Sequence, residues 1–378
     1  MKNRFRLGII LIVVLAVLGA GSASAQGEYE DYMPEFDTED ARGVVLAVSE
    51  YEEIEDDWFF VGRQMLTVEI LTGKFKGHIE EIENTFTGNP YRDLEVRPGD
   101  QVILLLEVDQ GRLLNVHLNG LARDRHLYIM VAVFIFTVVI IARFKGIKAL
   151  VTLVLMGFVI LRWLLPLILE GYNPLLLTVL FTSLITGVTL AIVGGINAKT
   201  AAAILGTIGG VGAAGLLAWI FGNLTRITGI SEEAQMLFFA DLPVDLDVRG
   251  LLFSGIIIGA LGAVMDVAMS IASAIAEVKQ ANPRLAFSGL FTAGFNVGRD
   301  VLGTMVNTLI LAYAGGALPL LLLFMAHNID YMNIINLDLV ATEVVRSIAG
   351  SFGLLITVPL TAVLAALLMS RARKKATT

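Results

Sequence analysis

The chain has 378 residues, of which 56% are hydrophobic and 37 are glycine, and its mean hydropathy is +0.76. A soluble protein of this length would be far less apolar, so the composition predicts several membrane-spanning helices. The formal net charge of −8 arises from an excess of acids in residues 26–126, which makes nucleic acid an unexpected partner. The absence of cysteine excludes thiolate metal sites, and neither a cofactor nor a metal site is predicted.

Residues 1–25 have the composition of a secretory signal peptide. Three basic residues precede position 7, residues 7–18 form an apolar run, and residues 23–25 (Ala-Ser-Ala) offer a small-residue cleavage site. A retained N-terminal anchor is the alternative. Both interpretations place the segment that follows outside the cytoplasm.

Residues 26–126 are predicted to form an acidic extracytoplasmic domain. After an acidic leader, β-type patterns begin near Arg42 and are separated by turn sequences such as residues 97–100 (Arg-Pro-Gly-Asp). The expected strands cover residues 43–48, 64–71, 78–84, 101–108 and 113–118. Five or six short strands in about 80 residues predict a small β-barrel or sandwich, similar in size to an OB-fold. The domain contains no recognisable catalytic constellation.

Residues 127–378 are predicted to form a polytopic α-helical membrane domain with seven spans. The spans are expected at residues 127–142, 150–169, 175–193, 201–221, 251–272, 301–325 and 350–369. Basic residues follow the first span, recur in alternate connections and fill the C-terminal tail. Because positive residues mark the cytoplasmic side, we expect a multi-pass protein of a bacterial cytoplasmic membrane, with residues 26–126 outside and the C-terminus inside.

The fifth span contains an acid within its hydrophobic sequence. Asp266, Ser270, Ser273 and Glu277 share with three glycines a stripe of roughly 80° on the helix. An unpaired polar group is costly in hydrocarbon, so this stripe must face another helix or water. We expect Asp266 to face the two spans that follow it.

The sixth and seventh spans also carry polar faces, and the three faces together predict one polar path. The residues assigned to it on these two spans are Arg299, Asp300, Thr304, Asn307, Thr308, Glu343 and Arg346. The alternative is that small and hydroxyl residues only let helices pack closely, which we favour for the glycines of residues 201–221. Arg299 and Asp300 are alternatively a charged helix start.

Several polar motifs of the membrane part together resemble the YibE/F family of bacterial multi-span membrane proteins. The motifs are Gly259–Ser273 (GALGAVMDVAMSIAS), Gly298–Tyr313 (GRDVLGTMVNTLILAY), Gly195–Gly210 (GINAKTAAAILGTIGG), Glu343–Gly350 (EVVRSIAG) and Thr357–Thr361 (TVPLT). The resemblance extends less sharply to the strand segment around Pro98. It implies the multi-span architecture and leaves the activity open.

These patterns support three hypotheses about function. The leading one is a transporter or permease for a small solute or ion, in which Asp266 binds a cation or proton, Asn307 binds the solute, and Glu343 and Arg346 form an outer gate. The second is a non-transporting scaffold or sensor whose outer domain binds a partner. The third is a membrane enzyme that uses acids at the interface, although no soluble-enzyme motif is present. The expected partners are the bilayer, the solute, and a second copy or another membrane protein.

Overall fold

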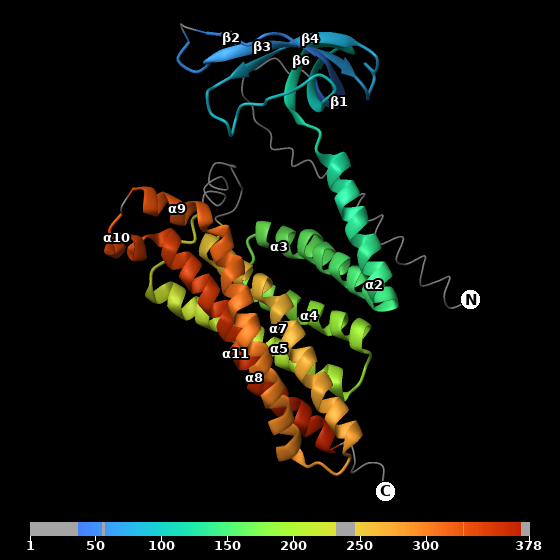
Figure 1. Cartoon of the computed structure of the whole chain (residues 1–378), viewed down its shortest axis with the longest axis vertical. Helices are drawn as coiled ribbons and strands as arrows, with labels where there is room; N and C mark the ends of the chain where they lie inside the picture. The colour runs from blue at the N-terminus through green and yellow to red at the C-terminus, as the bar shows by residue number, and fades with distance from the viewer. Residues whose placement is uncertain (1–36, 55–56, 232–245, 328, 372–378) are drawn as a thin grey trace, which may run out of the picture. The chain divides into compact units, whose positions relative to one another are not determined.

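The structure, a computed structural model, describes residues 37–54, 57–231, 246–327 and 329–371. The predicted signal peptide, the acidic leader up to residue 36 and the acidic residues 232–245 lie outside the described residues. The described residues fall into two compact units, which meet in the sequence between Ile141 and Ala142 and are treated separately below (Figure 1).

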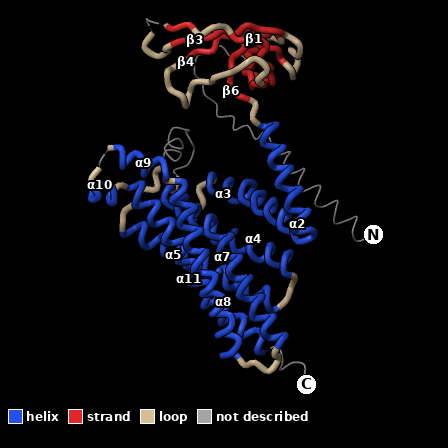
Figure 2. The backbone as a smooth tube through the Cα atoms, in the orientation of Figure 1, coloured by secondary structure: helices blue, strands red, loops and turns tan. Residues whose placement is uncertain are grey.

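The N-terminal unit contains an antiparallel sheet of six strands, followed by the first part of α2 (Asp124–Val159) (Figure 2). They are β1 (Asp37–Val48), β2 (Glu52–Glu53), β3 (Gly62–Ile70), β4 (Ile79–Phe86), β5 (Gln101–Asp109) and β6 (Arg112–Leu121). Their order is β2-β3-β1-β5-β6, and β4 pairs with β3. The five expected strands are all present, but the sheet is an open half-barrel, and an OB-like fold is not confirmed.

Period-two alternation explains why one face of this sheet is buried. Leu104 and Leu106 of β5 and Leu66 and Val68 of β3 are almost completely buried, whereas the residues between them are only partly covered. Successive side chains on a strand point to opposite faces, so the apolar set forms a single core. This regular pattern is the reason that the sequence predicted these strands well.

Polar turns join the strands. The backbone N–H and the hydroxyl of Thr87 donate to Asp93 Oδ1 at 2.6 and 2.8 Å, and these hydrogen bonds lower the pKa of the Asp93 carboxyl. In the predicted 97–100 turn, the backbone N–H of Arg97 donates to Asp100 Oδ2 at 2.8 Å. Gly99 adopts a φ of +93°, a backbone conformation that is unfavourable for a residue with a side chain.

The remainder of the described chain is helical. The helices are α2 (Asp124–Val159), η1 (Ile160–Leu164), α3 (Leu165–Leu169), α4 (Pro174–Gly194), α5 (Ala198–Leu224), α7 (Val248–Ala281), α8 (Phe287–Gly316), α9 (Leu318–Ala326), α10 (Tyr331–Asn336) and α11 (Asp338–Arg371). Within the described residues, five helical segments are long and apolar enough to cross a membrane. The bent pair α8–α9, with an angle of 60°, forms a sixth candidate, so seven spans are not confirmed.

Two local features account for the difference in span number. The first two expected spans are joined in one 46-residue helical segment, Asp124–Leu169, whose regular backbone is interrupted at Arg143 with a φ of 49°. The expected sixth span is split between α8 and α9, and Pro319 stands in the first turn of α9. Proline lacks the N–H that would continue the preceding helix, which explains the bend there.

The sixth span also begins earlier than the sequence predicted. α8 starts at Phe287, because the preceding residues Asn282 and Pro283 end α7 and the new helix packs Leu290 and Gly294 into the core. Arg299 and Asp300 therefore lie well inside α8. The alternative interpretation of these two residues as a charged helix start is wrong.

Close packing of α5 against α11 organises the helical unit (Figure 1). A β-carbon at Gly206 would collide with Thr361, and one at Gly210 would collide with Thr357 and approach the Gly353 carbonyl oxygen to 2.9 Å. The Thr357 hydroxyl donates to that same carbonyl at 2.7 Å. Glycine is thus required for the contact, and these residues of α5 form a packing seam.

We predict that Gly210→Ala destabilises the helical unit by about 1–3 kcal/mol, because the added methyl group overpacks this seam. The matched control is Gly212→Ala on the same helix, where a β-carbon would have no heavy atom within 4 Å. The measurement is thermal unfolding of the purified full-length chain in detergent. Equal unfolding temperatures for the two variants would contradict the packing role of Gly210.

Candidate functional site

The polar stripe of α7 lies on an exposed face of the chain. Asp266, Ser270 and Glu277 are exposed and Ser273 is half-buried. Within the described residues Asp266 forms neither a hydrogen bond nor an ion pair. This differs from the expectation that Asp266 faces companions on the next two spans.

The surroundings of α7 explain that difference. Its apolar sides pack against α5, α11 and α8, where Ile257, Val264 and Ile271 are completely buried. α4 contacts a further side, as shown by Met269, whose terminal methyl group would lie 2.7 Å from a β-carbon at Gly194. The stripe that contains Asp266 is the only side of α7 that these described helices leave open.

The polar residues of α8 also lie on its uncovered side. Arg299, Asp300, Thr304, Asn307 and Thr308 are all exposed. The buried side of α8 carries Gly294 and Gly298, where β-carbons would collide with Ile275 and Val358. The Thr304 and Thr308 hydroxyls donate to carbonyls of their own helix, those of Val301 at 3.0 Å and Thr304 at 2.9 Å.

Asp266 of α7 and Asp300 of α8 lie at similar distances from the connection between the two helices. At about 1.5 Å per residue, Asp266 is roughly 22 Å before the end of α7, and Asp300 is roughly 20 Å after the start of α8. The two helices are antiparallel neighbours joined by a short connection. Both acids therefore lie near the middle of the hairpin.

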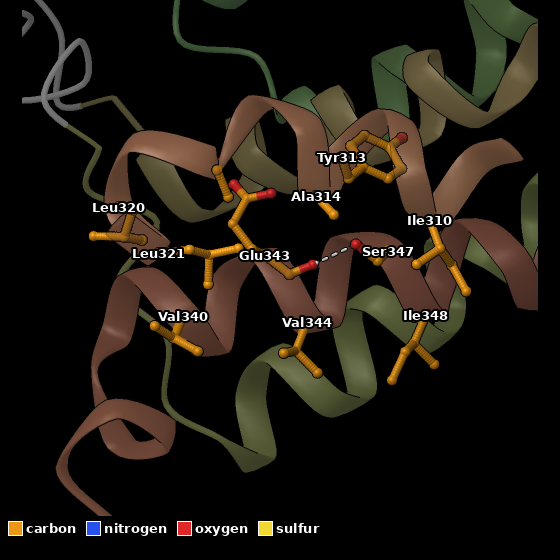
Figure 3. Close-up of a pocket in the computed structure, with 11 residues that line it drawn as sticks. Ile310, Tyr313, Ala314, Leu320, Leu321, Val340, Glu343, Val344, Ser347 and Ile348 are labelled. Atoms are coloured by element: carbon orange, nitrogen blue, oxygen red, sulfur yellow. Dashed lines mark hydrogen bonds between the residues drawn. The ribbon is translucent and has the colours of Figure 1, made fainter. Parts of the chain in front are cut away.

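Glu343 and Arg346 form an ion pair near the start of α11. The distance from Arg346 Nη1 to Glu343 Oε1 is 2.6 Å, and both side chains are partly buried. Glu343 also lines a cavity of about 300 Å³ between α8, α9 and α11 (Figure 3). The other lining residues are apolar except for Tyr313 and Ser347, so Glu343 provides the only charge there.

Tyr313 was not predicted as a site residue. Its hydroxyl is buried without a hydrogen-bond partner in the described part of the chain, and a β-carbon at Gly259 would lie 2.6 Å from it. The tyrosine hydroxyl thus lies against the α7 stripe at Gly259, and the residue lines the same cavity as Glu343 (Figure 3). The only sequence signal that could have identified Tyr313 as a site residue was the presence of a tyrosine within an apolar span.

A second hollow, of about 630 Å³, lies at the other end of the bundle. The residues that line it include Lys199 from the start of α5, Glu277 and Lys279 from α7, and Met369 from α11. The Lys279 ammonium donates to the carbonyls of Pro283 and Leu285 at 3.0 and 2.9 Å. The α7 stripe therefore leads from Asp266 through Ser273 and Glu277 into a hollow lined by both charges.

The structure thus groups the predicted residues in three places. It brings Asp266, Ser270 and the polar residues of α8 to exposed faces, Glu277 to the hollow lined by Lys199 and Lys279, and Glu343, which is paired with Arg346, to the cavity between α8, α9 and α11. The C-terminal half of α11 does not border these places with polar groups at Thr357 and Thr361, because both side chains point towards α5. No group of three potential metal ligands occurs among the residues described.

Comparison with known families covers nearly the whole chain. The family described as YibE/F-like protein matches residues 130–371, and the one described as YibE/F family N-terminal domain matches residues 38–121. No curated protein and no solved structure matches the chain.

Proposed function

The chain belongs to the YibE/F-like family, and from this premise we propose that it is a membrane transporter or permease for a small solute or ion. The proposed path follows the polar faces of α7 and α8, with its inner mouth at the hollow near Glu277 and its outer mouth near Glu343. Asp266 is the cation or proton site and Asn307 a solute ligand. The ion pair between Glu343 and Arg346 acts as the outer gate.

The proposed topology has seven spans in a bacterial cytoplasmic membrane, after a signal peptide or anchor. The break at Arg143 supports two spans in the segment Asp124–Leu169, and the pair α8–α9 supplies one more. The hollow supports a common cytoplasmic end, because it gathers Lys199, Lys279 and the end of α11. Residues 26–126, with an OB-like half-barrel, are then outside.

The observation that carries the proposal is the exposed position of Asp266 near the middle of a candidate span. A charged side chain facing lipid at that depth is strongly disfavoured, so such residues mark ion pathways, water-filled cavities or protein contacts. No described residue of the chain neutralises Asp266 through an ion pair. A mobile cation or proton would supply that neutralisation, which is the chemistry of a coupling site.

We predict that reconstituted wild-type protein dissipates an imposed pH gradient faster than protein-free vesicles do. Asp266→Asn lowers this rate at least about tenfold, because the amide cannot hold or release the proton. A pH-sensitive dye enclosed in vesicles of anionic and neutral phospholipid measures the rate. The control is Glu170→Gln, an exposed acid at the end of α3, which leaves the rate unchanged. If the Asp266→Asn variant dissipated the pH gradient at the wild-type rate, Asp266 would have no role in the proposed mechanism.

The sensor or scaffold hypothesis has one observation in its favour. In the N-terminal unit Trp58 is fully exposed and Tyr91 is 93% exposed, and Phe59 lies largely in solvent next to Trp58. Exposed aromatic side chains are enriched where proteins bind partners. The outer unit therefore offers a binding surface that a permease would not need.

Removal of residues 26–125 distinguishes these two functions. If the chain is a permease, the truncated protein retains the pH-gradient dissipation of the full chain, because the path lies wholly in α7, α8 and α11. If the chain is a sensor, the truncation abolishes function while the helical unit stays folded. Circular dichroism of the truncated protein in detergent provides the folding control.

A further inference from the structure

Two faces of the helical unit differ sharply in chemistry. The uncovered residues of α4 are leucines, with Leu176 70% exposed and Leu180 64% exposed, as expected for a surface that contacts lipid. The uncovered residues of α7 and α8 near mid-span are instead charged, polar or glycine. We define the polar face by Asp266, Ser270, Arg299, Asp300 and Asn307.

We propose that a second copy of this chain covers the polar face and forms a symmetric dimer in the membrane. The inference follows from polar groups and packing alone, so it stands whether or not the protein is a transporter. Hydrocarbon cannot satisfy these groups, and the described residues supply Asp266 with no partner. Another protein surface at the same depth can supply one.

The charges of the polar face and their positions along the helices indicate that the covering surface belongs to a second copy of the chain. Two copies inserted with the same orientation are related by a two-fold axis along the membrane normal, so each residue meets residues at its own depth. The polar face carries both signs at one level, because the base Arg299 is adjacent to Asp300 and close in depth to Asp266. The face is therefore complementary to itself, and Arg299 of one copy can pair with an acid of its partner.

Glycines on the same side allow the close approach that such a contact needs. β-carbons at Gly255, Gly262 and Gly303 would have no heavy atom within 4 Å, in contrast to the packed glycines Gly206 and Gly210. Small residues at helix interfaces in membranes let two backbones come near enough for hydrogen bonds between side chains. The space beside these three glycines is empty in the single chain and would be occupied by the partner copy in the dimer.

The chain contains no cysteine, so in a cross-linking test a single introduced cysteine is the only thiol that can react. Asn307→Cys on the polar face is treated with a bifunctional maleimide in native membranes, and Leu180→Cys on α4 serves as the control for random collision. The proposal predicts a product of twice the chain mass for Asn307→Cys and only single chains for Leu180→Cys. Equal products for the two variants, or an adduct of any other mass, would overturn it.

A second variant separates dimer formation from folding. Gly262→Leu has room in the single chain but would obstruct a partner copy, so it should raise the apparent dissociation constant of the dimer at least about tenfold. The constant is obtained by diluting Asn307→Cys protein, with and without Gly262→Leu, into increasing amounts of lipid and measuring the yield of cross-linked dimer at each dilution. Thermal unfolding confirms the fold. An unchanged constant in folded Gly262→Leu protein would also overturn the proposal.

Discussion

The contact between α5 and α11 determines which surfaces of the helical unit remain available. Glycines at 206 and 210 let the two helices approach until Thr357 and Thr361 fill the space between them. α7 then packs its apolar sides against both helices and against α8. Because these helices and α4 cover the other sides of α7, its polar stripe lies on the side that remains. The position of Asp266 is therefore a consequence of small-residue packing some distance away.

Much of this architecture could be predicted from the sequence because it depends on local periodicity. Alternation located β3 and β5, and continuous apolar runs located α4 and α5 within a few residues. Periodicity also showed that Asp266 and Ser270 share a face. It could not show which neighbour that face meets, because neighbours depend on how all the helices pack. The same limit applies to Thr357, which shares a stripe with Glu343 but contacts α5.

The arrangement gives a consistent physical account of a polar surface in an apolar protein. Glu343 is paired with Arg346 inside the chain, and its neighbours in the cavity between α8, α9 and α11 are mostly apolar. Among the described residues Asp266 has no such partner, and it lies on a stripe that continues to the charged hollow at the other end of the bundle. Water, a cation or a second copy of the chain can each satisfy a carboxylate in this position, whereas lipid cannot. A hydrated path bordered by two copies would combine the proposed function with the proposed dimer.

Spin labels on cysteines introduced at Ser270 and at Leu216, which is exposed on apolar α5, give the most direct test of this account. Relaxation by a water-soluble nickel complex reports contact with water, and relaxation by oxygen reports contact with lipid. The account predicts that nickel dominates at position 270 and oxygen at position 216 in full-length protein in bilayers. Oxygen-dominated relaxation at both positions would place the α7 stripe in lipid and contradict the central claim.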